Sequence, residues 1–144
     1  IKAARKLAGF LGIEPTVKIV LEKNLPIASG IGGGSTDAAA TLLALVQLWQ
    51  VQIKQEDLLK LALELGADVP SCIEKIPVQV AGIGEILTPA PRLPKLAMVL
   101  MNPNKPVSTP QIFKSRKPIF TEANPFLHDI FDTDEFRYLE QEIK

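Results

Sequence analysis

A glycine-rich stretch of the chain has the composition of an anion-binding turn. Four glycines fall within residues 30–34, and Ser35, Thr36 and a run rich in alanine and leucine follow at once. Because a glycine has no Cβ atom, an anion can approach its backbone closely. A helix that starts at such a turn adds unpaired amides and the positive end of its dipole. The stretch therefore predicts either a phosphate site or a flexible turn that caps a core helix.

Asp68 is the second candidate for chemistry. It follows an expected helix, has the apolar neighbours Ala67 and Val69, and has no basic residue close by in the sequence. A solvated carboxylate is the usual role of an aspartate, and the apolar neighbours leave open the alternative of a carboxylate that is partly buried and unpaired. Such a carboxylate is a candidate general base.

Two familiar phosphate loops do not match the glycine-rich stretch. A Walker A loop needs Gly-Lys before Ser or Thr, but Gly34 precedes Ser35 directly and the turn contains no lysine. The dinucleotide-binding fingerprint needs a third glycine or alanine after G-x-G-x-x, where this sequence has Ser35. The preceding segment also alternates apolar and polar residues, which is wrong for a central parallel strand. The sequence thus predicts a phosphate loop of another kind.

Residues 26–39, PIASGIGGGSTDAA, resemble the ATP-binding motif of the GHMP kinases, P-x-x-x-G-L-G-G-G-S-S-D-A-A. The two departures, Ile31 for leucine and Thr36 for serine, keep an apolar residue and a hydroxyl. The resemblance implies a small-molecule phosphotransferase whose loop holds the phosphates of ATP with Mg²⁺, which Ser35 is able to reach. The ATP-binding residues that it implies are Pro26, Ile27, Ala28, Ser29, Gly30, Ile31, Gly32, Gly33, Gly34, Ser35 and Thr36.

Three further segments resemble one branch of that family, whose substrate is 4-diphosphocytidyl-2-C-methyl-D-erythritol. They are residues 65–72 (LGADVPSC), 82–89 (GIGEILTP) and 108–113 (STPQIF). This resemblance implies phosphorylation of the substrate's 2-hydroxyl, with Asp68 as catalytic base, in the non-mevalonate route to isoprenoids and terpenoids. It also implies that Thr109, Pro110 and Phe113 line the cytidine diphosphate end, with Phe113 stacked on cytosine. From the residues alone, a core role is the default for Phe113.

Other functions stay open at this point. The chain also fits a GHMP kinase that acts on another small alcohol, a non-catalytic nucleotide-binding homologue, or a structural α+β domain with a glycine-rich cap. Single residues do not decide among these. Asp37 suits a helix start at least as well as a metal site, Cys72 and Trp49 are expected in the core, and His128 has no partner pattern.

The resemblance implies a two-domain α+β fold, present only in part. Residues 1–89 would belong to the N-terminal ATP-binding domain, which is like domain 2 of ribosomal protein S5. Residues 90–144 would be a linker and the start of an α/β-sandwich C-terminal domain. The family also has a catalytic lysine in an N-terminal segment and a C-terminal glycine loop, neither of which we can assign here. We therefore expect an excerpt of a longer protein, inactive on its own.

The spacing of apolar residues predicts the elements that position these residues. The expected helices are residues 1–10 with Gly12 as cap, 35–49, and 58–65 with Gly66 as cap. Between them we expect a half-buried strand over 17–22, a loop over 24–34 and extended chain over 67–72.

The second half of the chain has weaker signals. Strand is expected over residues 77–87, broken at Gly82 and Gly84 by either a hairpin turn or a bulge. The remaining expectations are a buried strand over 96–101, a helix that starts at Ser108-Thr109-Pro110, and a last helix over 132–144.

Composition excludes some classes of partner. Lysine and arginine number 16, as do aspartate and glutamate, so the formal net charge is zero. A neutral chain argues against wrapping of nucleic acid or binding to a membrane surface, whereas a small anionic ligand needs only a local field. The single cysteine leaves no disulfide within the chain, which fits a reducing cytoplasm, and the resemblance implies a bacterial one. No apolar run is long enough to span a bilayer, and the oligomeric state is not predicted by any pattern.

Overall fold

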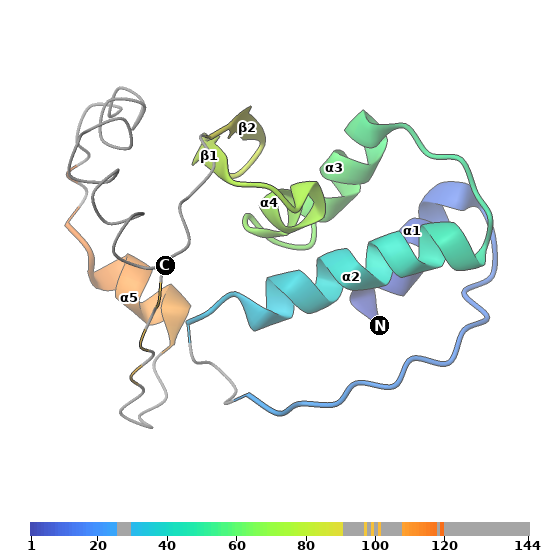
Figure 1. Cartoon of the computed structure of the whole chain (residues 1–144), viewed down its shortest axis with the longest axis horizontal. Coiled ribbons are helices and arrows are strands. Elements are labelled where there is room, and N and C mark those ends of the chain that lie inside the picture. Colours follow the sequence, from blue (N-terminus) through green and yellow to red (C-terminus); the bar gives the residue numbers. More distant parts are fainter. Residues whose placement is uncertain are drawn as a thin grey trace.

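The computed structural model describes residues 1–25, 30–90, 97, 99, 101, 108–117 and 119. The elements of this part are α1 (Lys2–Leu11), α2 (Gly33–Leu48), α3 (Gln55–Leu63), α4 (Val69–Glu74), β1 (Val78–Ala81), β2 (Ile86–Pro89) and α5 (Thr109–Ser115). Figure 1 shows α1, α3 and α4 gathered around the long helix α2, with the hairpin of β1 and β2 beyond α4. This combination of helices with a small antiparallel sheet confirms the expected α+β class.

Helix α1 forms as its apolar spacing predicts. Its buried residues recur three or four positions apart and are Ala3, Ala4, Leu7 and Ala8. The predicted cap at Gly12 is confirmed, with a left-handed φ of 67°. The amide of Ile13 then donates to the carbonyl of Ala8 at 3.0 Å, which satisfies one of the last carbonyls of the helix.

Helix α2 is the centre of the core, as predicted for residues 35–49, although it begins two residues earlier, at Gly33. Its buried residues are Ala39, Leu42 and Leu45. Leu42 is fully buried, and burial of a leucine side chain contributes about 2 kcal/mol. The other helices contribute Leu7, Leu58, Leu61, Ala62, Val69 and Ile73 to the same cluster. Trp49 and Cys72 pack partly buried against it, as expected.

The strand predicted over residues 17–22 is absent, since this segment forms neither helix nor strand. Val17 packs against the core, but Val20 and Leu21 are 80% and 60% exposed. A strand needs a hydrogen-bonded neighbour, and the sheet among the described residues contains only β1 and β2. The segment instead returns along α2 as an irregular, extended chain (Figure 1).

The connection from α3 to α4 differs from the prediction in two ways. The C-cap of α3 is Glu64 rather than Gly66, although the amide of Gly66 still donates to carbonyls of the last turn. The extended chain expected over residues 67–72 is wrong, because Val69–Glu74 is helix α4. Pro70 is compatible with this helix because its missing N–H falls in the first turn, where no intrahelical bond is lost.

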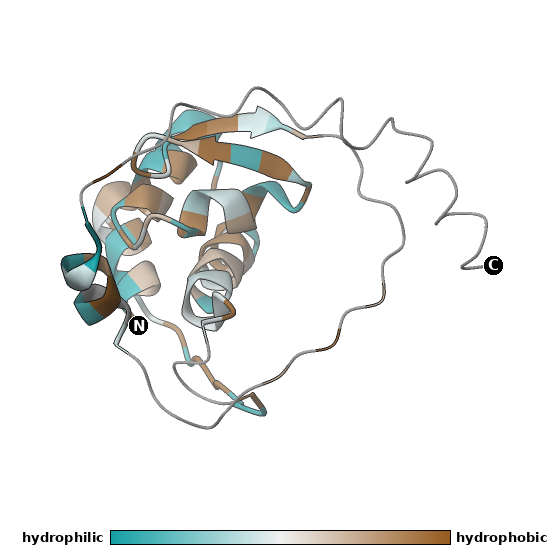
Figure 2. Ribbon diagram, turned by 90° about the vertical axis from the view of Figure 1, so that its left-hand side faces the viewer, coloured by the Kyte–Doolittle hydropathy of each residue, from teal (hydrophilic) through white to brown (hydrophobic). Residues whose placement is uncertain are grey.

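The hairpin, one of the two alternatives predicted for residues 77–87, is confirmed. Strands β1 and β2 are antiparallel, with Val78 opposite Pro89 and Ala81 opposite Ile86. The turn uses two glycines with positive φ, Gly82 and Gly84. Figure 2 shows that both strands mix apolar and polar residues. Strand β1 packs on α4, so the hairpin is attached to the helical core.

The remaining structural predictions concern the second half. Helix α5 begins after Ser108, as the Ser-Thr-Pro signal predicts. The buried strand expected over residues 96–101 is wrong at its described positions, where Val99 and Met101 are 89% and 90% exposed. The helix expected over 132–144 and His128 lie outside the described residues. Among the helices that the structure describes, none has the length and apolar character needed to cross a membrane.

Candidate active site

The glycine-rich stretch forms a left-handed turn directly before α2. Gly30 has φ 75°, and Gly32, the N-cap of the helix, has φ 72°. Such backbone costs other residue types about 1–2 kcal/mol, so the turn itself requires these two glycines. Ile31 between them is 46% exposed. The first residues of the predicted ATP-binding set lie outside the described residues: Pro26, Ile27, Ala28 and Ser29.

Gly33 and Gly34 have no comparable reason to be glycine. Neither has a positive φ, and a Cβ atom built on either would meet no described atom within 4 Å. Glycine is less stable than alanine in a helix by roughly 0.5–1 kcal/mol. Neither backbone geometry nor packing of the described residues explains this loss of stability. The space beside the two residues suits a ligand.

The first turn of α2 leaves backbone donors unused. The amide of Thr36 donates to the carbonyl of Gly32 at 3.0 Å, which is the first bond of the helix. The amides of Gly33, Gly34 and Ser35 precede it and have no helical acceptor. Together with the positive end of the helix dipole, these N–H groups can bind a phosphate.

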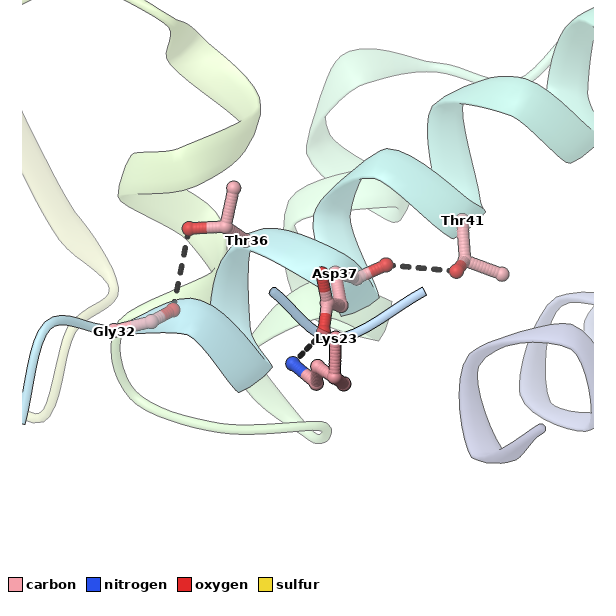
Figure 3. Close-up of polar contacts among 5 residues, drawn as sticks. All are labelled: Lys23, Gly32, Thr36, Asp37 and Thr41. Carbon is pink, nitrogen blue, oxygen red and sulfur yellow. Dashed lines mark hydrogen bonds and ion pairs between the residues drawn. The ribbon is translucent and has the colours of Figure 1, made fainter. Parts of the chain in front are cut away.

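The two hydroxyls of the first turn differ in their partners. Thr36 Oγ1 donates to the carbonyl of Gly32 at 3.2 Å (Figure 3) and lies 3.8 Å from Cys72 Sγ. In this structure the Thr36 hydroxyl therefore stabilises the turn. The hydroxyl of Ser35 makes no hydrogen bond to any other described residue. Ser35 is thus the hydroxyl of this turn that is available to a phosphate or its cation.

An ion pair joins the chain before the glycine turn to the helix after it. Lys23 Nζ lies 2.5 Å from Asp37 Oδ2, and the two side chains are 41% and 42% exposed (Figure 3). Asp37 is the fifth residue of α2 and lies too far from the start to cap it, so the helix-start role, one of the two left open for it, does not apply. The sequence did not indicate Lys23, because the partners are 14 residues apart and no local spacing connects them.

Asp68 is exposed, as is usual for an aspartate, and is not partly buried as its apolar neighbours in the sequence suggested. It directly precedes α4, and its carboxylate makes no hydrogen bond or ion pair with any side chain that the structure describes. The backbone brings it toward the glycine turn. The amide of Cys72 donates to the Asp68 carbonyl at 3.4 Å, and Cys72 Sγ contacts Thr36. The two candidates for chemistry are therefore separated by one helical turn and one side-chain contact.

Gly84 packs against the chain next to Asp68, a role that the sequence did not reveal. It is buried, and a Cβ atom on it would lie 2.1 Å from the carbonyl oxygen of Ala67. Only a glycine allows this approach. The hairpin turn thus fixes the backbone immediately before Asp68. The sequence indicated a bend at Gly84 but not its neighbour, which is distant in the chain.

The predicted cytosine-binding residues Thr109, Pro110 and Phe113 lie on helix α5. Phe113 is 66% exposed and Ile112 is 55% exposed, so neither is part of the core. The core role that is usual for a phenylalanine is therefore absent for Phe113. Thr109 and Pro110 are the first two residues of α5.

Comparison with known protein families shows to which family the chain belongs. The model of the GHMP kinases N terminal domain matches residues 1–75, more than half of the chain. The chain belongs to the GHMP kinases. The family predicted from residues 26–39 is therefore confirmed, and the matched region contains both the glycine turn and Asp68.

Curated relatives of this GHMP kinase chain share one name. A 4-diphosphocytidyl-2-C-methyl-D-erythritol kinase of Rhodospirillum rubrum is 52% identical over 125 residues, which cover 87% of this chain and 41% of the relative. A protein of the same name from Paramagnetospirillum magneticum is 49% identical over 125 residues, which cover 87% of this chain and 44% of the relative. Another, from Rhizobium johnstonii, is 62% identical over 68% of this chain and 32% of the relative. The chain thus spans less than half of the length of these relatives.

Proposed function

We propose that the protein, at its natural length, transfers the γ-phosphate of ATP to the 2-hydroxyl of 4-diphosphocytidyl-2-C-methyl-D-erythritol, a step toward isoprenoids. The names of the relatives support this substrate. The observation that carries the phosphate chemistry is the pair Gly33 and Gly34, whose missing Cβ atoms no described contact explains. In this proposal, residues 1–89 belong to the ATP-binding domain, and residues 90–144 form a linker and the start of the C-terminal domain.

The glycine turn would hold the phosphates through its backbone. The free amides at the start of α2 are donors, and no lysine occurs in the turn to replace them. Phosphoryl transfer requires in-line positioning and neutralisation of charge more than covalent help from the protein. Amides that are fixed at a helix start provide both with little reorganisation.

Mg²⁺, when bound with ATP, would neutralise charge on the phosphate oxygens. Within the described ranges, no group of three or more His, Cys, Asp or Glu side chains is placed to hold a metal ion. This donor set fits a cation that keeps most of its ligands from the nucleotide and water, as Mg²⁺ does at phosphate sites. The free hydroxyl of Ser35 is the protein oxygen that suits such a cation.

Asp68 would accept the proton of the acceptor hydroxyl. Its carboxylate is exposed and has no described partner, so it is available for a hydrogen bond to the substrate. The contact of Gly84 with Ala67 holds the backbone beside it. Phe113 would bind the cytosine by stacking its exposed ring on the base, next to Thr109 and Pro110.

ADP release by the natural-length protein, with Mg²⁺-ATP and 4-diphosphocytidyl-2-C-methyl-D-erythritol, tests this proposal. Asp68→Asn removes the base and keeps the size of the side chain. We expect kcat to fall by about 10²–10⁴-fold, with little change in the KM for ATP. Asp57→Asn is the matched control, because Asp57 lies in the first turn of α3 and pairs with Lys60 at 3.5 Å. This control should keep the turnover of the wild type.

Turnover that is lost only in Asp68→Asn supports both the reaction and the base. If the variant retains turnover close to that of the wild type, Asp68 is not the base. A wild-type protein that binds ATP without turning over this substrate would instead be a GHMP kinase of another alcohol or a non-catalytic homologue.

A further inference from the structure

The polar contacts around the start of α2 form an inner and an outer set. Inside the helix, Thr36 Oγ1 donates to the Gly32 carbonyl at 3.2 Å, and Thr41 Oγ1 donates to the Asp37 carbonyl at 2.7 Å (Figure 3). Both bonds join residues of α2 and its N-cap, so they stabilise the helix itself and do not connect it to another segment. Outside the helix, the Asp37 carboxylate meets Lys23, which belongs to the extended chain before the glycine turn.

This ion pair is the only polar contact between residues 13–25 and α2 in the part of the chain that the structure describes. The neighbours of Lys23 hold the segment weakly, since Val20 and Leu21 are 80% and 60% exposed. Lys23 precedes Gly30 by seven residues, and Asp37 lies little more than one helical turn after the start of α2. The pair therefore joins the chain before the glycine turn to the helix after it.

We infer that Lys23 and Asp37 are a positioning pair, which holds the chain before the glycine turn against the helix after it and so strengthens the binding of Mg²⁺-ATP. The inference deepens the proposed function and rests on it. The pair acts without touching the nucleotide, because it limits the conformations that the turn must lose on binding. Exposed ion pairs are weak, so breaking this one should lower the affinity by about two- to fivefold.

A purely electrostatic role would give a different pattern. If Lys23 served only as a positive charge for the phosphates, its removal would weaken binding, whereas neutralisation of Asp37 would free Lys23 and strengthen binding. A positioning pair fails when either partner is lost. Neutral replacement of either residue must then weaken binding to a similar extent, and an inverted pair must restore it.

Calorimetric titration of the natural-length protein with Mg²⁺-ATP, without acceptor, distinguishes these roles. The variants are Lys23→Gln, Asp37→Asn, and Lys23→Asp combined with Asp37→Lys. We expect each single variant to raise Kd by about two- to fivefold, and the inverted pair to return it to about the wild-type value. Lys6→Gln and Glu64→Gln are matched controls that should not change Kd, because Lys6 and Glu64 form an ion pair between α1 and the end of α3.

Steady-state kinetics adds a second measurement, the KM for ATP compared with kcat, which a purely structural role of the pair would not change selectively. The single variants should raise the KM for ATP and leave kcat unchanged. Opposite shifts of Kd in the two single variants, or an inverted pair that fails to restore binding, would overturn the inference and leave the kinase proposal intact. A wild-type protein that does not bind Mg²⁺-ATP would overturn both.

Discussion

Gly34→Ala should stabilise the fold and weaken nucleotide binding, a combination expected where a ligand determines the glycine. Gly34 is the second residue of α2, and the added methyl group would meet no described atom within 4 Å. Alanine is favoured over glycine inside a helix, and the preference is smaller near a helix end. We therefore expect the free energy of unfolding to rise by about 0.5 kcal/mol.

The same methyl group would occupy the space that we assign to a phosphate. If it moves a phosphate oxygen away from one amide, one charge-assisted hydrogen bond is lost, at about 1.5–3 kcal/mol. This loss corresponds to a Kd for Mg²⁺-ATP that is raised roughly tenfold to a hundredfold. Because the two effects differ in sign, a general loss of structure cannot produce both.

Urea denaturation measures the first effect and calorimetric titration with Mg²⁺-ATP measures the second, both on the natural-length protein. Gly9→Ala is the matched control. Gly9 is exposed within α1, has no positive φ, and likewise has no described atom within 4 Å of the Cβ position. It should gain stability and bind ATP as the wild type does. Wild-type affinity in Gly34→Ala would refute the assignment of this space to a phosphate.

Two further predictions concern the framework of the site, and urea denaturation checks both. Gly84→Ala should lower the free energy of unfolding by about 2–4 kcal/mol, because its methyl group would lie 2.1 Å from the Ala67 carbonyl oxygen at φ 113°. Gly82→Ala meets only a flexible side chain and should lower it by about 1–2 kcal/mol; equal losses would contradict the close contact. Leu42→Ala should lower it by about 2–5 kcal/mol, because the side chain is fully buried. The exposed Leu48→Ala should change it by less than about 0.5 kcal/mol, and similar losses would contradict the central position of Leu42.

The sequence predicted the elements whose signals are local. Apolar residues at helical spacing are enough to define α1, and Gly12 marks its end. The hairpin is encoded in the same way by the two glycines of its turn. The glycine turn before α2 was predictable because positive φ and unpaired amides both follow from residue types within a few positions.

The errors concern segments whose structure depends on distant neighbours. Residues 17–22 alternate as a strand does, but none of the described segments pairs with them. Residues 67–72 follow Gly66, which looks like the end of a helix, yet packing against α2 supports a further short helix there.

The contacts that the sequence missed are long-range pairs. Lys23 forms an ion pair with Asp37 on the other side of the glycine turn, and Gly84 in the hairpin turn packs against Ala67, which precedes α4. Neither separation corresponds to a helical or strand period, so neither pair produces a pattern along the chain. Both pairs hold the segments that carry the candidate chemistry, which is why the residues of the site were easier to predict than their geometry.

Helix α2 links the core of this GHMP kinase chain to its candidate active site. Its buried residues Ala39 and Leu42 belong to the core cluster, to which α4 also contributes, while its first turn presents unpaired amides. Close packing of α4 on α2 brings Cys72 Sγ to 3.8 Å from Thr36 Oγ1, and the same helix begins at Asp68. The separation between the phosphate-binding amides and the proposed base is therefore set by the packing of two helices. Because packed interiors are close to incompressible, a core substitution between α2 and α4 would move the base relative to the nucleotide without contacting either.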